Sequence, residues 1–285
     1  MLKILVTGGK GQLAQCIEKL SNSYYFEFIF KSSSDLNISK FGELKKELSE
    51  NNYDYCINCA AYTQVDKAES EVEQANCINH LAIENIAILC EKYKVTLIHI
   101  STDFVFSGDN SIPYLEDDKT NPLGVYGKSK LDGESKIQQN LTEFFIFRTS
   151  WLYSEFGNNF LKSMLKHGRE KEQLSVVYDQ IGTPTYAMDL AELILKIICS
   201  ESKNYGIYHY SNEGVASWYD FAFCIFKLGN INCDLRAIRT SEYPTPAKRP
   251  CFSVLDKSKI KTTFQIKIPH WQESLTKAID NIAKK

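Results

Sequence analysis

The 285-residue sequence lacks any apolar run approaching the roughly 20 residues that a membrane-spanning helix needs. It also lacks an excess of charge of either sign. The net charge of -2 provides no general attraction to nucleic acid or to anionic membranes. The first residues, MLKILVTGG, lead directly into an expected strand and lack the layout of a signal peptide. We therefore expect a soluble cytoplasmic protein that binds neither nucleic acid nor a membrane.

The nine cysteines lack the regular spacing of a disulfide framework, and their number is odd. Cys56 and Cys59 form a C-x-x-C pair in the segment YDYCINCAAY, along an expected strand. Positions three apart on a strand point to opposite faces, which is poor geometry for a shared metal ion. We expect reduced core thiols and assign no metal ligand from the sequence.

The first half of the sequence alternates short apolar runs with helical patterns. The apolar runs predict strands at residues 3–7, 26–30, 53–58, 95–101 and 144–150. Helices are expected at residues 12–20, 39–50, 71–93 and 126–139. Near-continuous apolar strands that alternate with helices are typical of a parallel sheet covered on both faces. The predicted fold is therefore α/β, a Rossmann-type doubly wound sheet.

The pattern loosens after Trp151. Helices are expected at residues 158–168, 188–199, 217–229 and 271–283, with a strand at 206–211. Ser217 is expected to cap the third of these helices, and the proline-rich segment 242–250 to be an ordered loop or an irregular segment. We predict an NAD(P)-binding Rossmann domain at residues 1–150. Residues 151–285 would form a smaller substrate-binding region folded over the sheet edge, with elements returning to the core.

A glycine-rich turn joins the first strand to the first helix in VTGGKGQLAQ. Gly8, Gly11 and Ala14 give G-x-x-G-x-x-A in the strand–turn–helix context that a dinucleotide fingerprint requires. Gly8 would permit the tight turn, and Gly11 would let the backbone approach a pyrophosphate at the helix N-terminus. A purely structural turn is the alternative.

The end of the second strand bears on the choice of cofactor. Lys31, Ser32 and Ser33 stand where an acidic residue for the ribose 2′-hydroxyl is expected. A cation and hydroxyls suit a 2′-phosphate better than a bare ribose. The sequence therefore favours NADPH, with NADH tolerated, over a merely solvated loop.

Three side chains in the middle of the chain suggest hydride-transfer chemistry. Tyr126 and Lys130, in GVYGKSK, lie one helical turn apart and so share a face. The Tyr-x-x-x-Lys spacing alone is weak evidence for a catalytic pair, because an ordinary helix surface also contains such pairs. A nearby ammonium would lower the pKa of a phenol, and Thr102, at the end of a strand, could fix a substrate oxygen. Together with the dinucleotide turn, the three indicate carbonyl reduction or alcohol oxidation.

This combination resembles the extended short-chain dehydrogenase/reductase superfamily and, within it, the dTDP-4-dehydrorhamnose reductases. The likeness covers almost the whole chain. The segments that show it are TGGKGQLA, CAAYTQVDKAE, STDFVFSG, NPLGVYGKSKLDGE, FRTSWLY, VVYDQIGTPTYAMDLAE, GIYHYSNEGVASWYDFA and YPTPAKRPCFSVLD.

The resemblance implies reduction of the C4 ketone of dTDP-4-dehydro-6-deoxy-L-mannose to dTDP-L-rhamnose. Tyr126 would supply the proton, Lys130 would orient the nicotinamide ribose and tune Tyr126, and Thr102 would bind the ketone oxygen. Asp103 and Trp151 match positions that contact the sugar nucleotide, although Trp151 could also be a core aromatic. The positions that match cofactor contacts are Gly11, Gln12, Leu13, Asp35, Leu36, Ala61, Tyr62 and Thr63.

Two departures from the family and two rival functions accompany this resemblance. Phe104 stands where the family commonly has Tyr, and Ala14 where it often has Gly. Some members bind magnesium at a dimer contact, but the acidic ligands cannot be placed in this sequence; a homodimer is left open. The rivals are a sugar-nucleotide dehydratase or epimerase, and a non-catalytic subunit resembling the regulatory subunit of methionine adenosyltransferase. A dehydratase would follow Thr102 with an Asp–Glu pair, whereas this chain has Asp103 and Phe104.

Overall fold

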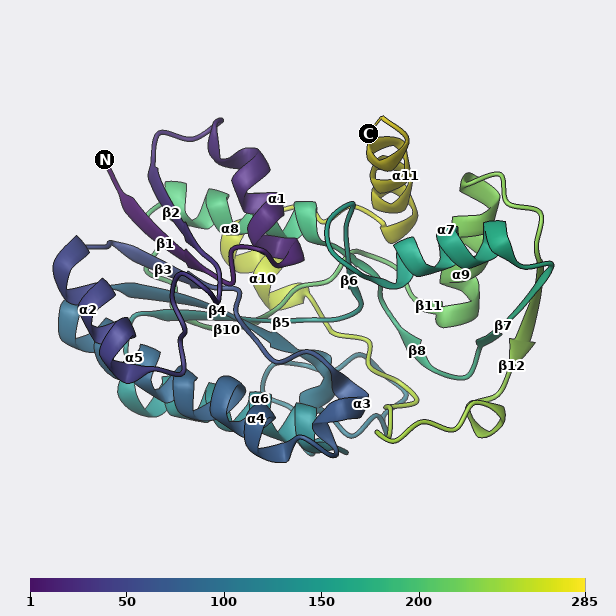
Figure 1. Cartoon of the computed structure of the whole chain (residues 1–285), viewed down its shortest axis with the longest axis horizontal. Helices are drawn as coiled ribbons and strands as arrows, with labels where there is room; N and C mark the ends of the chain where they lie inside the picture. Colours follow the sequence, from purple (N-terminus) through teal and green to yellow (C-terminus); the bar gives the residue numbers. More distant parts are fainter. Residues whose placement is uncertain (285) are drawn as a thin grey trace.

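A six-stranded parallel sheet organises the chain, in a computed structural model that describes residues 1–284 (Figure 1). The strands pair in the order β10-β5-β4-β3-β1-β2, and every pair in this sheet is parallel. Their bounds are β1 Lys3–Thr7, β2 Glu27–Lys31, β3 Tyr55–Asn58, β4 Thr96–Thr102, β5 Phe144–Thr149 and β10 Gly206–His209. The predicted doubly wound α/β fold is confirmed, and the expected strands differ from the observed ones by only one or two residues at most ends.

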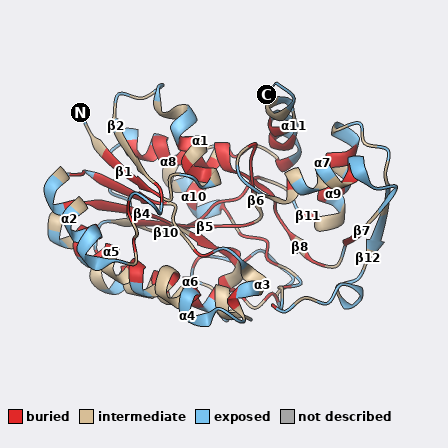
Figure 2. Ribbon diagram, viewed as in Figure 1, coloured by how far each residue is buried: buried red, intermediate tan, exposed pale blue. Residues whose placement is uncertain are grey.

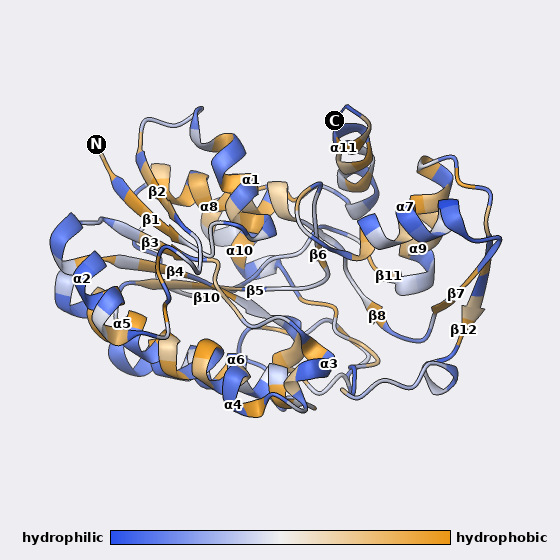
Figure 3. Ribbon diagram, in the orientation of Figure 1, coloured by the Kyte–Doolittle hydropathy of each residue, from blue (hydrophilic) through white to orange (hydrophobic). Residues whose placement is uncertain are grey.

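Alternate residues of each strand point to opposite faces of the sheet and build two separate cores. In β1, Ile4 and Val6 belong to one apolar cluster, and Leu5 between them belongs to the other. β5 follows the same rule, with Phe145 and Phe147 on one side of the sheet and Ile146 on the other. Figure 2 shows the strands of the sheet as mostly buried, apart from β2 at the edge, and Figure 3 shows them as mostly apolar. Burial on both faces explains why the strands appear in the sequence as continuous apolar runs.

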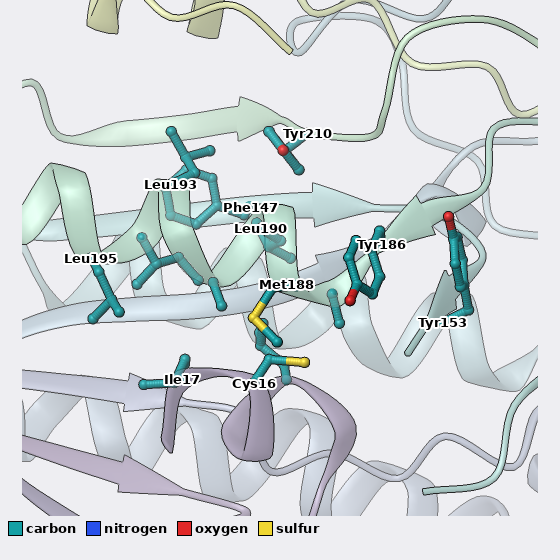
Figure 4. Packing of buried hydrophobic residues seen from close by; sticks show 14 of the residues in the cluster. Cys16, Ile17, Phe147, Tyr153, Tyr186, Met188, Leu190, Leu193, Leu195 and Tyr210 are labelled. Atoms are coloured by element: carbon teal, nitrogen blue, oxygen red, sulfur yellow. The ribbon is translucent and has the colours of Figure 1, made fainter. Parts of the chain in front are cut away.

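Helices cover both faces of the sheet. α1 (Gln12–Ser21), α8 (Ala187–Cys199) and α10 (Ser258–Phe264) lie on one face, and α2 (Phe41–Asn51), α5 (Ala82–Tyr93) and α6 (Val125–Asn140) lie on the other (Figure 1). Figure 4 shows the first core from close by, where Cys16 and Ile17 of α1 face Met188 of α8. The second half of the chain thus supplies part of the core that supports α1 and the glycine-rich turn before it.

The helical region expected at residues 71–93 is interrupted. α4 (Val72–Asn76) passes into a π-helical turn, Cys77–Leu81, before α5 begins. Within this turn Asn79 is fully buried, and its side-chain amide accepts from the Tyr62 N–H and donates to the Tyr62 carbonyl and to Ser129 Oγ. Such turns are frequent near functional sites, and here one ties the segment after β3 to helix α6.

Apart from α8, β10 and α10, the chain after residue 150 forms smaller units beside the sheet edge (Figure 1). β7 (Gln173–Val177) pairs in parallel with β12 (Asp234–Ile238), and β6 (Leu152–Tyr153) pairs in parallel with β9 (Thr185–Tyr186). β8 (Ile181–Gly182) and β11 (Ala216–Ser217) form an antiparallel pair. Helices α7 (Phe160–Glu170), α9 (Trp218–Leu228) and α11 (Trp271–Ala283) cover them. The strands of these pairs, the short helix α3 (Val65–Ala68) and α10 were not predicted. The division of function at residue 150 stays a prediction.

Two local predictions in this region are confirmed. Ser217 caps α9 through a reciprocal capping box with Asp220: Ser217 Oγ accepts from the Asp220 N–H at 3.0 Å. Between the short 3₁₀ turn Thr240–Glu242 and residue 250 the chain is irregular, as the proline content indicates. None of the helices within residues 1–284 combines the length and apolar character needed to cross a bilayer.

Candidate active site

A cavity of about 650 Å³ opens at the carboxyl ends of the strands. Its walls come from the segments that follow β1, β3, β4 and β5, together with α6 and parts of the second half of the chain. The sheet order reverses between β1 and β3, because the chain leaves β1 toward β2 and returns to the other side. Ligands of open α/β sheets bind in the crevice at such a reversal.

The glycine turn after β1 forms one wall of this cavity, and at Gly8 it leaves no room for a side chain. Gly8 has a φ of +66°, and a Cβ there would lie 2.7 Å from the Ala60 backbone nitrogen. Gly11 precedes α1, and no side chain caps the helix at that position. The first N–H groups of α1 and its positive dipole end therefore face the cavity uncapped, as a pyrophosphate site requires. These features fit a dinucleotide cofactor.

Thr102, Tyr126 and Lys130 line the same cavity, reaching it from β4 and α6. Tyr126 makes a hydrogen bond with Thr102, and burial raises the pKa of its phenol to about 12. The sequence led us to expect a lowered phenol pKa beside Lys130. In this structure burial outweighs every other influence, so Tyr126 holds its proton at neutral pH.

The Lys130 ammonium is fixed at the back of the cavity. Its Nζ donates to the Ile100 carbonyl at 2.6 Å and lies 3.1 Å from His99 Nε2. Burial lowers the pKa of Lys130 to about 8, and the nearby carboxylate of Glu134 opposes this shift. Lys130 is therefore still mostly protonated at pH 7, but its proton is held much less tightly than that of an exposed lysine.

The residues after Thr102 lie at the same corner of the cavity as Thr102, Tyr126 and Lys130, which we call the reacting corner. Thr102 Oγ1 donates to Asp103 Oδ1 at 3.1 Å and accepts from the Phe104 N–H at 3.2 Å. Burial raises the pKa of Asp103 to about 6. The Phe104 ring stands edge-on to the Tyr126 ring, with centroids 5.7 Å apart. The phenylalanine that departs from the family pattern therefore packs directly against the tyrosine.

Another part of the cavity wall is formed by aromatic rings and a cationic side chain. Trp151 and Trp218 stack face to face, and Arg249 forms an ion pair with Asp66 at 2.7 Å. Trp218 and Arg249 also line a second cavity of about 630 Å³, between α7, β7 and the irregular segment after β12. The two cavities thus meet at Trp218 and Arg249.

Comparison with known proteins gives one consistent result. A family model described as RmlD substrate binding domain matches residues 2–284. A dTDP-4-dehydrorhamnose reductase from Aggregatibacter actinomycetemcomitans is 40% identical over 96% of this chain and 97% of that protein. The chain belongs to the dTDP-4-dehydrorhamnose reductase family.

Solved structures agree with this membership. The crystal structure of a dTDP-4-dehydrorhamnose reductase from Clostridium acetobutylicum has a TM-score of 0.96 and 40% identity, covering 99% of this chain and all of that one. The reductase from Bacillus anthracis, solved in complex with NADP, has a TM-score of 0.95 and 35% identity, with the same coverage.

Most of the site residues expected in this reductase fold do line the first cavity. Besides the three reacting side chains they are Gly11, Gln12, Leu13, Ala61, Thr63, Asp103 and Trp151. Thr149 also lines it, and its buried Oγ1 has no hydrogen-bond partner within residues 1–284. An unpartnered buried hydroxyl at a cavity wall is consistent with a ligand that completes it.

Five expected cofactor residues lie outside the cavity lining. Gly8 shapes the turn from behind it. Lys31 Nζ lies 3.4 Å from Glu47 Oε2, and Asp35 accepts from the Ser32 N–H and hydroxyl. Leu36 packs in the core beneath α2, and the Tyr62 phenol donates to Glu71 at 2.7 Å. Cofactor contacts by Lys31, Asp35, Leu36 and Tyr62 stay predictions, whereas Lys10, which the sequence analysis passed over, does line the cavity.

Other residues that reasoning from the sequence missed are Asn58, Trp218 and Arg249. The segments that contain the last two were noted for their family likeness, but no local pattern shows which side chain reaches across to the sheet. Within residues 1–284, no cluster of three or more His, Cys, Asp or Glu side chains is arranged to hold a metal ion.

Proposed function

We propose that the protein reduces the C4 ketone of dTDP-4-dehydro-6-deoxy-L-mannose to dTDP-L-rhamnose with NADPH, and that Tyr126 donates the proton. Family membership supports the reductase activity and the sugar nucleotide. The observation that supports the role of Tyr126 is its position with Thr102 and Lys130 on one cavity, opposite the uncapped start of α1.

The protonation states favour reduction. Bound NADPH would supply the hydride to the ketone carbon. Tyr126 has a pKa of about 12 and so holds a proton that it can pass to the developing alkoxide. Thr102 would donate a second hydrogen bond to the same oxygen, and the Lys130 ammonium would stabilise the phenolate left on Tyr126.

The cofactor would lie between the glycine turn and the reacting corner. Gly8 and Gly11 allow the pyrophosphate to approach the backbone, and Lys130 would hold the nicotinamide ribose. The relative from Bacillus anthracis was solved with NADP. Lys10, which lines the cavity, and Lys31 at the end of β2 are the two cations close to Asp35. They suit a 2′-phosphate, which supports NADPH as the preferred cofactor with NADH accepted less well.

The second cavity would hold the nucleotide part of the substrate. It combines apolar and aromatic walls, including Leu174, Val176 and Tyr243, with the cation Arg249. A thymine ring suits the former and a diphosphate the latter. Because both cavities share Trp218 and Arg249, one elongated sugar nucleotide could span them while its ketone reaches Tyr126.

The rival functions have less support. Phe104 occupies the position where a dehydratase would need a Glu, and its ring packs against Tyr126 instead. A non-catalytic subunit would not require an intact reacting trio. We keep a cytoplasmic location and a homodimer as predictions.

The test is consumption of NADPH or NADH by the wild type with freshly generated keto-sugar, beside Tyr126→Phe. Loss of general acid catalysis predicts a rate decrease of about 10²- to 10⁴-fold in the variant, with NADPH binding retained by fluorescence titration. A folded wild type that binds NADPH but turns over no substrate would refute the proposed function. Full activity in Tyr126→Phe would refute only the role of the tyrosine.

A further inference from the structure

Behind the reacting corner, a chain of buried polar side chains runs away from Lys130 through the sheet. Lys130 Nζ lies 3.1 Å from His99 Nε2 on β4, and His99 Nδ1 lies 3.0 Å from the Asn58 side-chain amide on β3. The atom of Asn58 nearest to His99 is Nδ2, and Asn58 Oδ1 accepts from Thr7 Oγ1 on β1 at 2.6 Å. His99 and Thr7 are fully buried, and Asn58 is nearly so. Three neighbouring strands thus each contribute one polar group below the cavity.

No carboxylate forms an ion pair with Lys130 in the part of the chain that the structure describes. Glu134, one helical turn further along α6, is bound instead by the Arg148 guanidinium and the Ser101 hydroxyl. The identified acceptors for the ammonium are the Ile100 carbonyl and His99. The ionisable groups that act on Lys130 are thus His99 from β4 and Glu134 from α6. Tyr126 lines the same cavity and has Asp103 near it.

Hydrogen-bonding capacity then fixes the state of the imidazole. An ammonium has three donors and no acceptor, so His99 Nε2 must be unprotonated and Nδ1 must hold the proton. The structure has Asn58 Nδ2 facing His99 Nδ1 and Asn58 Oδ1 accepting from Thr7 Oγ1. The Nδ1–H tautomer therefore requires this amide to be turned over, with its oxygen toward His99 Nδ1 and its nitrogen toward Thr7. The amide orientation in the structure would place the proton on Nε2 and would suit only an uncharged amine. Burial and the charge of Lys130 both lower the pKa of His99, which keeps the ring neutral.

We propose that His99 is a positioning residue that acts through Lys130. Its neutral ring, held as the Nδ1–H tautomer by an Asn58 amide turned over from its orientation in the structure, accepts a hydrogen bond from the ammonium and holds it charged at the cavity wall. This role rests on the proposed function, because it matters for turnover only if Lys130 serves the reduction. A neutral acceptor favours the ammonium without cancelling its charge, so the charge stays available to the phenolate that forms on Tyr126.

The first experiment reads the tautomer directly in the wild type at pH 7. Long-range ¹H–¹⁵N correlation spectra of ¹⁵N-histidine-labelled protein distinguish the two tautomers, and His99→Gln identifies the His99 signal among the five histidines. We expect the Nδ1–H tautomer. The Nε2–H form, or a charged ring, would overturn the proposal. The result does not depend on turnover, so it is separable from a failure of the proposed function.

The second experiment compares pH profiles of kcat/KM for the wild type, His99→Phe and His99→Gln. Loss of the acceptor in His99→Phe should move the alkaline limb, which reports Lys130, about one pH unit lower, because a hydrogen bond to the charged form is removed. Glutamine retains an acceptor oxygen and should restore at least part of the shift. His80→Gln, in the π-helical turn, is the matched control and should keep the wild-type limb. A lower Tm with an unchanged limb in both His99 variants would show a purely structural role and overturn the proposal.

Discussion

The indole rings of Trp151 and Trp218 stack face to face, with centroids 3.6 Å apart and 9° between their planes. Trp151 leaves β5 with a φ of +47°, in the left-handed region that bulky residues rarely adopt. A Cβ on Gly182 would lie 2.7 Å from the Trp151 ring, so the ring is held on both faces. Strained backbone that is fixed in this way is typical of binding sites. The pair forms a rigid wall of the first cavity, and Trp218 also lines the second.

Removing the Trp218 ring, which stacks on Trp151, should weaken substrate binding. We expect Trp218→Ala to raise the KM for the sugar nucleotide about tenfold, because aromatic surface worth about 1.4 kcal/mol is lost. kcat should fall less, since Tyr126 and Lys130 are untouched. Trp218→Phe keeps a stacking ring and should recover most of the affinity. Steady-state kinetics with saturating NADPH measure both, and an unchanged KM in Trp218→Ala would contradict the assigned wall.

The Arg249 guanidinium contacts Asp66 with two nitrogens, at 2.7 and 3.1 Å, across 183 positions of sequence. A lysine cannot reproduce this paired geometry. We expect Arg249→Lys to raise the KM for the sugar nucleotide by about 5- to 30-fold, the range for loss of roughly 1–2 kcal/mol from a charged hydrogen bond. The Kd for NADPH should stay unchanged. Arg236→Lys alters an exposed ion pair with Asp234 and is the matched control. Equal kinetic effects in both variants would argue against a role for Arg249 in the site.

Asp103 should make folding stability depend on pH in a defined direction. Its pKa is raised by burial to about 6, above the value of about 3.9 in an unfolded chain. Between these values the folded state binds more protons, so its contribution to stability is complete below about pH 4 and is lost as the pH rises through 6. Asp103→Asn removes this loss.

We therefore expect Asp103→Asn to gain stability relative to the wild type as the pH rises from 4 to 7. The gain should approach about 2–3 kcal/mol, since each pKa unit corresponds to about 1.4 kcal/mol. Urea unfolding at pH 4, 5.5 and 7 measures it. Asp109→Asn, at an exposed aspartate, should show no such trend. A constant difference between Asp103→Asn and wild type at all three pH values would contradict the raised pKa.

Two glycines should respond in opposite directions to alanine. Gly8 has a positive φ and no space for a Cβ, so Gly8→Ala should lose about 1–2 kcal/mol of stability from the backbone alone, and NADPH affinity as well. Gly42 lies in α2, where a Cβ would have no other atom within 4 Å, and Gly42→Ala should gain about 0.5–1 kcal/mol. Thermal unfolding and NADPH titration of both variants give the comparison. Normal cofactor binding by Gly8→Ala would show that the turn does not approach the pyrophosphate.

Local patterns in the sequence were enough to predict the sheet, the covering helices and the common position of Thr102, Tyr126 and Lys130 on one cavity. These patterns are apolar strands buried on both faces, helical periodicity, a glycine turn between a strand and a helix, and two side chains one turn apart. The capping of α9 by Ser217 is equally local. Each of these features could be predicted because the residues that decide it lie within a few positions of one another.

Other side chains reach the cavity of Thr102, Tyr126 and Lys130 from distant parts of the sequence, and their position depends on tertiary packing. Trp218 and Arg249 meet the sheet edge through contacts that span many elements, and no local pattern encodes that approach. The same holds for His99, which is one apolar-flanked position of a strand in the sequence but the partner of Lys130 in the fold. The protonation states of Tyr126 and Asp103 were likewise beyond sequence reasoning, because burial, which only packing determines, outweighs the neighbouring charges.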